Sequence, residues 1–293
     1  MCSALEAVLS MAKILVTGGS GFVGSHVATH LRLLGHEVST PTRRQLNLLD
    51  REAVIRHLEK NQYDVVAHFA SPSPVRSPHI DSYDRLFRDS LTIFMNMAAG
   101  SSFYGRMLYS GSGAEYDKGR DIILVHEEEF GESVPKDDYG LAKYLMNVVA
   151  RQSANICNLR IFACFGPREY EDKFINHAIR CCRRGEPITI RQDCRFDYLY
   201  IEDYAKVVAY FVTHAPAHHD YNVTSSTRVL LSTIASEVKD IMSSDVEIII
   251  SDTNGLAREY TASNHRLISE TGNLGFMELR DSIRKYVASE EGE

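Results

Sequence analysis

The sequence of 293 residues has no long hydrophobic run, no excess of positive charge and no regular spacing of cysteines. A membrane-spanning helix needs about 20 consecutive apolar residues and no stretch of about 18 is present, so no membrane partner is expected. The formal net charge of -7 offers no basic field for nucleic acid, which is therefore not expected as a partner either. The remaining composition, 44% hydrophobic and 24% charged, is typical of a globular protein.

The six cysteines and the pair His218 and His219 do not form a recognisable metal or disulfide pattern. The cysteines lack the spacing of zinc ligands, and the two histidines belong to no zinc-like set of carboxylate or cysteine ligands. We predict reduced thiols, no metal and a cytoplasmic location. Residues 1–10 precede a second methionine and lack the basic segment and apolar core of a signal peptide, so they are interpreted as a short extension or alternative start.

The first two thirds of the chain alternate short apolar runs with amphipathic stretches. Buried strands are predicted at 13–18, 36–40, 64–70, 106–111 and 158–164. Helices are predicted at 21–34, 51–61, 83–99 and 139–153. Because right-handed crossovers place helices on both faces of a parallel sheet, this alternation predicts an α/β fold with a doubly wound parallel sheet, the Rossmann arrangement.

Beyond Gly166 and Pro167 the alternation loosens into short strands separated by helices. The strands are "EPITI", "DYLYI", "HDYNV" and "VEIII", and helices are predicted near 173–184, 203–214 and 231–242. We interpret this as a smaller C-terminal α/β part that binds substrate. The predicted domains are 1–166, mainly dinucleotide-binding, and 167–293, mainly substrate-binding, with interleaved segments.

The stretch "VTGGSGFVGSH" (16–26) follows the first predicted strand and opens a helix. Glycines at this junction permit a tight turn, close approach of backbone N–H groups to a pyrophosphate, and close packing of helix on strand. Dinucleotide binding is therefore predicted here rather than a purely structural turn. The candidate cofactor residues are Gly18, Gly21, Phe22, Val23 and Gly24.

The segment after the second predicted strand, "TPTRRQLNLLD", bears on the choice of cofactor. It has Arg43 and Arg44 but no carboxylate until Asp50. A carboxylate accepts the ribose hydroxyls of NAD and repels a 2′-phosphate, whereas an arginine can bind that phosphate through two hydrogen bonds. Arg43 thus favours NADP, with NAD still possible. The alternative is that both arginines are only exposed loop charges.

Tyr139 and Lys143 lie one helical turn apart in "DDYGLAK". Free tyrosine has a pKa of about 10, and a nearby ammonium favours its ionised form. Lys143 can also bind the nicotinamide ribose. A hydroxyl from "YSGSGAEY" (109–116), after the fourth predicted strand, could hold a substrate oxygen while Tyr139 exchanges its proton and the cofactor exchanges a hydride. These residues together predict an oxidoreductase.

Five motifs together resemble those of a known family, and the resemblance covers about residues 13–285. They are "TGGSGFVG", "SGSGAEY", "YGLAK", "RIFACFGPRE" and "DYLYIEDYAKVV". The chain resembles the extended short-chain dehydrogenase/reductase family of nucleotide-sugar epimerases, dehydratases and reductases. The resemblance implies a nucleotide-diphosphate sugar as substrate and a homodimer formed through the helices at 83–99 and 139–153.

The resemblance also implies individual roles. Ser112, four residues before Tyr116, becomes the catalytic hydroxyl, and Ser110 becomes structural. "LNLLD" (46–50) resembles the GDP-fucose synthase branch and implies that Asn47 and Leu48 flank the adenine. "HFASPSP" (68–74) resembles the strand end of nucleotide-sugar decarboxylases, with Ala70 toward the cofactor and Ser71 toward the substrate. The sequence departs from the family at Ala163, where asparagine is frequent, and at Phe196, where arginine is frequent, with Arg195 one position earlier.

The residues after Ser112 separate the possible reactions. Dehydratases of the family have acids in the next two positions, where this chain has Gly113 and Ala114, and Glu115 comes one position too late. Dehydration is therefore disfavoured. An NADPH-dependent 4-keto-sugar reductase is favoured over an NAD-dependent 4-epimerase, and a non-catalytic NADP-binding sensor is a third possibility. Candidates for the substrate end are Lys173 and Arg195, followed by Arg180, Arg191, Arg258 and His177.

Overall fold

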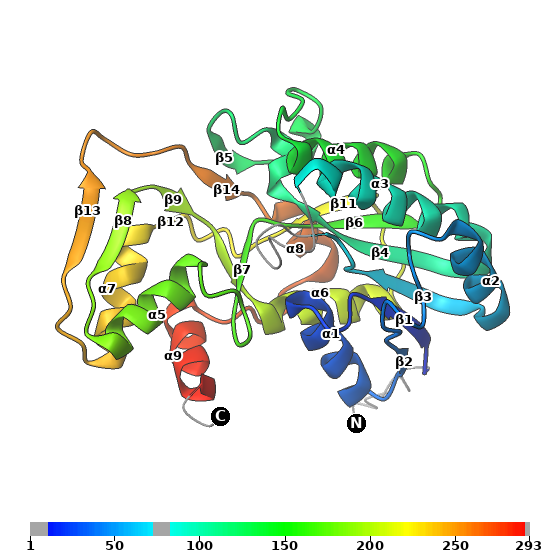
Figure 1. Cartoon of the computed structure of the whole chain (residues 1–293), viewed down its shortest axis with the longest axis horizontal. Coiled ribbons are helices and arrows are strands. Elements are labelled where there is room, and N and C mark those ends of the chain that lie inside the picture. The colour runs from blue at the N-terminus through cyan, green and yellow to red at the C-terminus, as the bar shows by residue number, and fades with distance from the viewer. Residues whose placement is uncertain (1–10, 73–82, 291–293) are drawn as a thin grey trace, which may run out of the picture.

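The computed structural model describes residues 11–72 and 83–290, and a six-stranded parallel sheet forms its centre (Figure 1). The strand order is β11-β6-β4-β3-β1-β2. The strands are β1 (Lys13–Thr17), β2 (Glu37–Ser39), β3 (Tyr63–His68), β4 (Tyr104–Ser112), β6 (Ile156–Ile161) and β11 (Asp220–Val223). The order reverses between β1 and β3, which is where a doubly wound sheet forms its ligand crevice.

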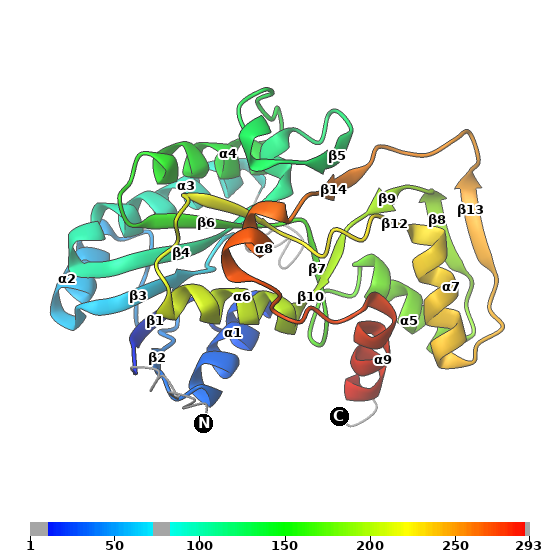
Figure 2. The same cartoon turned by 180° about the vertical axis from the view of Figure 1, so that it is seen from behind.

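Helices cover both faces of this sheet, as Figures 1 and 2 show. They are α1 (Phe22–Leu33), α2 (Arg51–Asn61), α3 (Tyr83–Ala99), α4 (Asp138–Arg151) and α6 (Ile201–Thr213). The apolar residues of α2, α3 and α4 share one core cluster with the sheet, and those of α1 and α6 belong to another. The predicted doubly wound, Rossmann-like α/β fold is confirmed.

The second part of the structure contains short strands and helices, most of which lie at the left in Figure 1. Its paired strands are β10 (Tyr198–Tyr200) with β7 (Ala163–Phe165), and β13 (Ile248–Asp252) with β8 (Ile188–Gln192). A four-stranded sheet has the order β12 (Val229–Leu230), β9 (Arg195–Phe196), β14 (Tyr260–Ala262) and β5 (Ile122–Val125). The remaining helices are α5 (Phe174–Arg184), α7 (Leu231–Met242), α8 (His265–Thr271) and α9 (Leu279–Glu290). The described residues also form the 3-10 turns η1 (Ser101–Phe103), η2 (Gly113–Tyr116) and η3 (Glu127–Glu129).

Two segments differ from the sequence prediction. The run at 158–164 is not one strand, because β6 ends at Ile161 and β7 begins at Ala163 to pair with β10 instead. "HDYNV", placed with the smaller part, contains β11, which pairs with β6 in the main sheet. Both α6 and β11 follow residue 166 and yet pack with the main sheet, so the chain crosses between the two parts more than once. The division at 166 itself stays a prediction.

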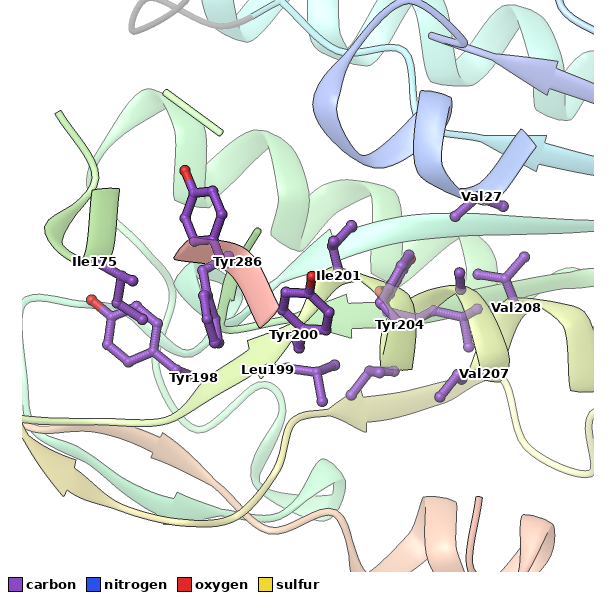
Figure 3. Close-up of a cluster of buried hydrophobic side chains, with 14 of the residues drawn as sticks. Val27, Ile175, Tyr198, Leu199, Tyr200, Ile201, Tyr204, Val207, Val208 and Tyr286 are labelled. Atoms are coloured by element: carbon purple, nitrogen blue, oxygen red, sulfur yellow. Dashed lines mark hydrogen bonds between the residues drawn. The ribbon is translucent and has the colours of Figure 1, made fainter. Parts of the chain in front are cut away.

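One continuous hydrophobic core joins the two parts (Figure 3). Val27 of α1 and Tyr204 of α6 belong to the same cluster as Ile175 of α5 and Tyr286 of α9, and all four are fully buried. Burial of this apolar surface holds the substrate part against the main sheet. Within residues 11–72 and 83–290, none of the helices has the length and apolar character needed to cross a membrane.

Candidate active site

A cavity of about 990 Å³ lies at the carboxyl ends of β1, β3, β4 and β6. Thr17, Ala70, Ser112 and Ile161, which end or closely follow these strands, all line it. The cavity extends from the glycine turn across Tyr139 to Arg258 in the C-terminal part. It therefore occupies the crevice that the strand order predicts, and it spans both parts of the molecule.

The glycine turn lines the cavity, and at Gly18 and Gly24 it leaves no room for a Cβ atom. Gly18 has φ +71°, and a Cβ there would lie 2.7 Å from the backbone nitrogen of Ala70. A Cβ on Gly24 would lie 2.2 Å from the carbonyl oxygen of Gly18. Gly21 precedes the first turn of α1 with no side-chain cap, and the residues from Gly21 to Gly24 all line the cavity. This cradle fits a pyrophosphate.

Every predicted cofactor residue lines the cavity. They are Gly18, Gly21, Phe22, Val23, Gly24, Arg43, Asn47, Leu48, Ala70 and Lys143. At the end of the cavity that follows β2, Arg43 is among the lining residues, whereas Arg44, which is also exposed, is not. The Leu48 carbonyl oxygen accepts a hydrogen bond from Asn96 of α3 at 2.9 Å, which holds the loop against this helix.

The three predicted catalytic residues meet in the middle of the cavity. Ser112 ends β4, and Tyr139 and Lys143 come from the first turns of α4. A Cβ on Gly140 would lie 2.9 Å from the carbonyl oxygen of Ala114, so the glycine lets α4 begin directly against η2. The Lys143 Nζ donates to the Ser110 backbone carbonyl oxygen at 2.7 Å, and Ser110 lines the cavity as well, so its structural role stays a prediction.

The protonation of this group follows from its burial. Burial raises the pKa of Tyr139, and a hydrogen bond with Ser112 opposes that shift without reversing it. Burial lowers the pKa of Lys143 to about 8, against the attraction of Glu115. The Lys143 Nζ lies 6.0 Å from the centre of the Tyr139 ring. At neutral pH Tyr139 therefore carries its proton and can donate it.

Glu115 is fully buried and does not line the cavity. Its carboxylate accepts hydrogen bonds from the Ser112 backbone nitrogen at 2.9 Å and from the Arg160 Nε at 2.8 Å. Gly113 and Ala114 are also outside the lining residues. Sequence analysis placed Glu115 one position too late for a dehydratase acid, and its side chain indeed does not enter the cavity. Instead, Glu115 anchors the Ser112 loop from within the core.

Arg160 extends this anchor across the sheet. Its fully buried guanidinium donates to Asp220 of β11 at 2.8 Å and to the Tyr116 hydroxyl at 2.9 Å. Burial by itself raises the pKa of Asp220, but Arg160 and Arg151 outweigh it and lower the pKa to about 2. Charged hydrogen bonds therefore connect the Ser112 loop to the strand that the C-terminal half adds to the main sheet.

Only some of the predicted substrate-binding residues line the cavity. Ser71 and Lys173 line the cavity, as does the secondary candidate Arg258. Arg195 does not line it, because its neighbour Phe196 takes that place in β9. Arg180, Arg191 and His177 are not among its described lining residues either.

Lys118, Arg120 and Tyr260 are among the cavity residues that sequence reasoning missed. Lys118 and Arg120 follow the serine loop within a few residues, so their proximity to it was a signal that could have found them. Tyr260 had no such signal, because only the pairing of β14 with β5 and β9 brings it to the site.

Fold and cavity together define a doubly wound nucleotide-binding protein. The model of the NAD dependent epimerase/dehydratase family matches residues 14–224, and the chain belongs to this family of NAD(P)-dependent nucleotide-sugar enzymes. The GDP-L-colitose synthase of Yersinia pseudotuberculosis is 22% identical over 252 residues, which are 74% of this chain and 80% of that protein.

Two solved structures illustrate the shared fold. A GDP-L-fucose synthetase from Naegleria fowleri bound to NADP has a TM-score of 0.80 at 16% identity, covering 94% of this chain and 93% of that one. A UDP-glucose 4-epimerase from Thermotoga maritima with UDP-glucose has a TM-score of 0.79 at 20% identity, covering 96% of this chain and 99% of that one. At these identities the likeness concerns the fold alone.

Proposed function

We propose that the protein is an NADP(H)-dependent reductase of a 4-keto nucleotide-diphosphate sugar. The observation that carries this proposal is a single cavity in which Ser112, Tyr139 and Lys143 meet beside a glycine cradle, with no carboxylate at the two positions that follow Ser112. Removal of water from a sugar needs a further acid and base, and neither Gly113 nor Ala114 supplies one. Reduction needs only a hydride and a proton.

We assign the parts of NADP to residues along the cavity, from the glycine turn to Lys143. The pyrophosphate would lie on the backbone between Gly18 and Gly24, and Asn47 and Leu48 would flank the adenine. Arg43 would bind the 2′-phosphate of NADP, with Ala70 and Lys143 at the nicotinamide end. When bound, the cofactor supplies the hydride that reduces the sugar carbon.

The protein's own residues would handle the proton. Ser112 holds the keto oxygen by a hydrogen bond, and Tyr139 donates its proton to that oxygen as the carbon is reduced. The raised pKa of Tyr139 suits this direction, because the phenol must be protonated at the start. Lys143, with a pKa of about 8, is placed near the phenol, and its positive charge favours the phenolate that forms.

A 4-epimerase is the second candidate, and a non-catalytic NADP-binding sensor a third. Epimerisation begins with oxidation of the sugar hydroxyl at C4. In that step Tyr139 must already be a phenolate, because it takes the proton of this hydroxyl. The raised pKa of Tyr139 and the position of Arg43 favour reduction. The retention of all three catalytic residues in one cavity argues against the sensor.

The proposal also covers the residues that bind the substrate, a homodimer and a cytoplasmic location. Lys173, Ser71 and Arg258 would bind the diphosphate and sugar. A homodimer would form through α3 and α4, where the Met95 side chain is 46% exposed on α3. The five described cysteines are free thiols, which suits a reducing cytoplasm.

The test is NADPH oxidation at 340 nm with a panel of 4-keto nucleotide sugars. Replacing Tyr139 with phenylalanine should lower kcat about 10²–10⁴-fold, the range for a lost general acid, and leave NADPH affinity within about twofold. Tyr144→Phe is the matched control, because Tyr144 lies on the same helix but stacks on Phe130 outside the cavity lining. Tightly bound NAD with interconversion of UDP-sugars in the absence of NADPH would show the protein to be an epimerase.

A further inference from the structure

Tyr260 of β14 brings a third hydroxyl group to the catalytic centre. Its ring centre lies 5.1 Å from that of Phe162 and 5.5 Å from that of Phe196, and all three rings line the cavity. The Tyr260 hydroxyl lies beside the Ser112 loop, and Ser112 lowers the pKa of both Tyr260 and Tyr139 against the effect of their burial. Ser112 therefore stands between two tyrosines, one from α4 and one from the C-terminal part.

The same side chain occupies the space beside Gly113. A Cβ on Gly113 would lie 2.6 Å from the Tyr260 hydroxyl oxygen and 2.6 Å from two carbons of the Phe162 ring. Real Cβ atoms essentially never approach other atoms that closely. Any side chain at position 113, an acidic one included, would need both rings to move, so Tyr260 and Phe162 together leave room only for glycine at this position.

The hydrogen bonds available to Ser112 show what the Tyr260 hydroxyl does there. A serine hydroxyl has one donor and two acceptor positions, and its proton rotates freely unless its partners fix it. The Ala114 backbone N–H donates to the Ser112 Oγ at 3.2 Å. If the Tyr260 hydroxyl donates as well, both acceptor positions are filled, and the serine proton is left for Tyr139 or for a substrate oxygen.

We propose that Tyr260 is a positioning residue, whose hydroxyl directs the Ser112 proton toward the reacting oxygen and whose ring pair with Phe162 excludes an acid at position 113. The proposal deepens the reductase function and rests on it. It also assigns a task to the C-terminal part beyond substrate binding, because β14 completes the hydrogen bonding of a residue in the main sheet.

The first test replaces Tyr260 with phenylalanine, which keeps the ring between Phe162 and Phe196 and removes only the hydroxyl. We expect kcat for the 4-keto sugar to fall about tenfold, the effect of one lost hydrogen bond, with KM and NADPH affinity within about twofold. Tyr286→Phe is the control, because Tyr286 is buried in α9 outside the cavity lining, and its kcat should be unchanged. A kcat for Tyr260→Phe within twofold of wild type would overturn the proposal.

A double-mutant cycle with Ser112→Ala separates positioning from a merely structural role. If Tyr260 acts through Ser112, then adding Tyr260→Phe to Ser112→Ala should change kcat less than about twofold. If Tyr260 only supports the fold, the two losses should multiply, and that result would refute the positioning role.

A measurement without turnover keeps this test independent of the reductase proposal. In protein with ¹³C-labelled tyrosine, NMR titration follows the pKa of Tyr139 directly. Tyr260→Phe should raise that pKa, because the Ser112 proton is then free to turn away from the phenolate, and the same change should have no effect in Ser112→Ala. An unchanged Tyr139 pKa would reject the positioning role, whereas a wild type that reduces no 4-keto sugar would reject only the reductase.

Discussion

Replacing Arg160 with methionine should destabilise the fold strongly. Arg160 and Glu115 are both fully buried, and the Arg160 guanidinium also pairs with Asp220. Methionine keeps much of the apolar stem and removes the charge, which leaves the Glu115 carboxylate in the core without a cation. Removing one partner of a buried ion pair costs about 3–5 kcal/mol, and we expect the free energy of unfolding to fall by that amount.

The assay is urea unfolding at pH 7, with Arg180→Met as the matched control. Arg180 pairs with Glu171, whose side chain is 72% exposed, so its loss should cost only about 0–1 kcal/mol. Burial already raises the pKa of Glu115, and losing Arg160 raises it further. A raised pKa means that the charged carboxylate is disfavoured in the folded state. The loss in free energy of unfolding that is due to Glu115 should therefore be small below about pH 4, where the carboxyl group is protonated in both states, and should grow as the pH rises. A loss below about 1 kcal/mol at pH 7 would refute this reasoning.

Three further predictions follow from the same contacts. Arg43→Ala should weaken NADPH binding about 10–100-fold and leave NADH binding within about twofold, whereas Arg44→Ala should change neither; equal losses for both cofactors, measured by fluorescence titration, would exclude a phosphate contact. Asp220 has a pKa lowered to about 2, so its contribution of about 2 kcal/mol is present above pH 4 and is lost as the pH falls toward 2. Asp220→Asn should therefore flatten acid unfolding between pH 4 and 2, and an unchanged slope would contradict that assignment. Gly24→Ala should abolish NADPH binding, since its Cβ would meet the Gly18 carbonyl oxygen at 2.2 Å, and wild-type affinity would show that the turn can relax.

Much of the main sheet could be predicted because its signals are local. The predicted helix at 51–61 coincides with α2, whose start is set by the Asp50 side chain accepting a hydrogen bond from the Ala53 nitrogen. The glycine turn was found for the same reason, since Gly18 and Gly24 serve a strand and a helix that adjoin them. Ser112, Tyr139 and Lys143 lie at the end of a predicted strand and the start of a predicted helix, so the topology alone brings them to one edge.

The amino-acid sequence by itself determined the doubly wound fold, the glycine turn and the residues beside it, because alternating hydrophobicity and glycine spacing act over a few residues. Only the tertiary structure decided that Glu115 turns into the core toward Arg160 rather than into the cavity. It also decided that Phe196 and Tyr260, not Arg195, face the site. Those choices depend on burial, charge pairing and strand pairing between segments far apart in the chain, which no local pattern encodes.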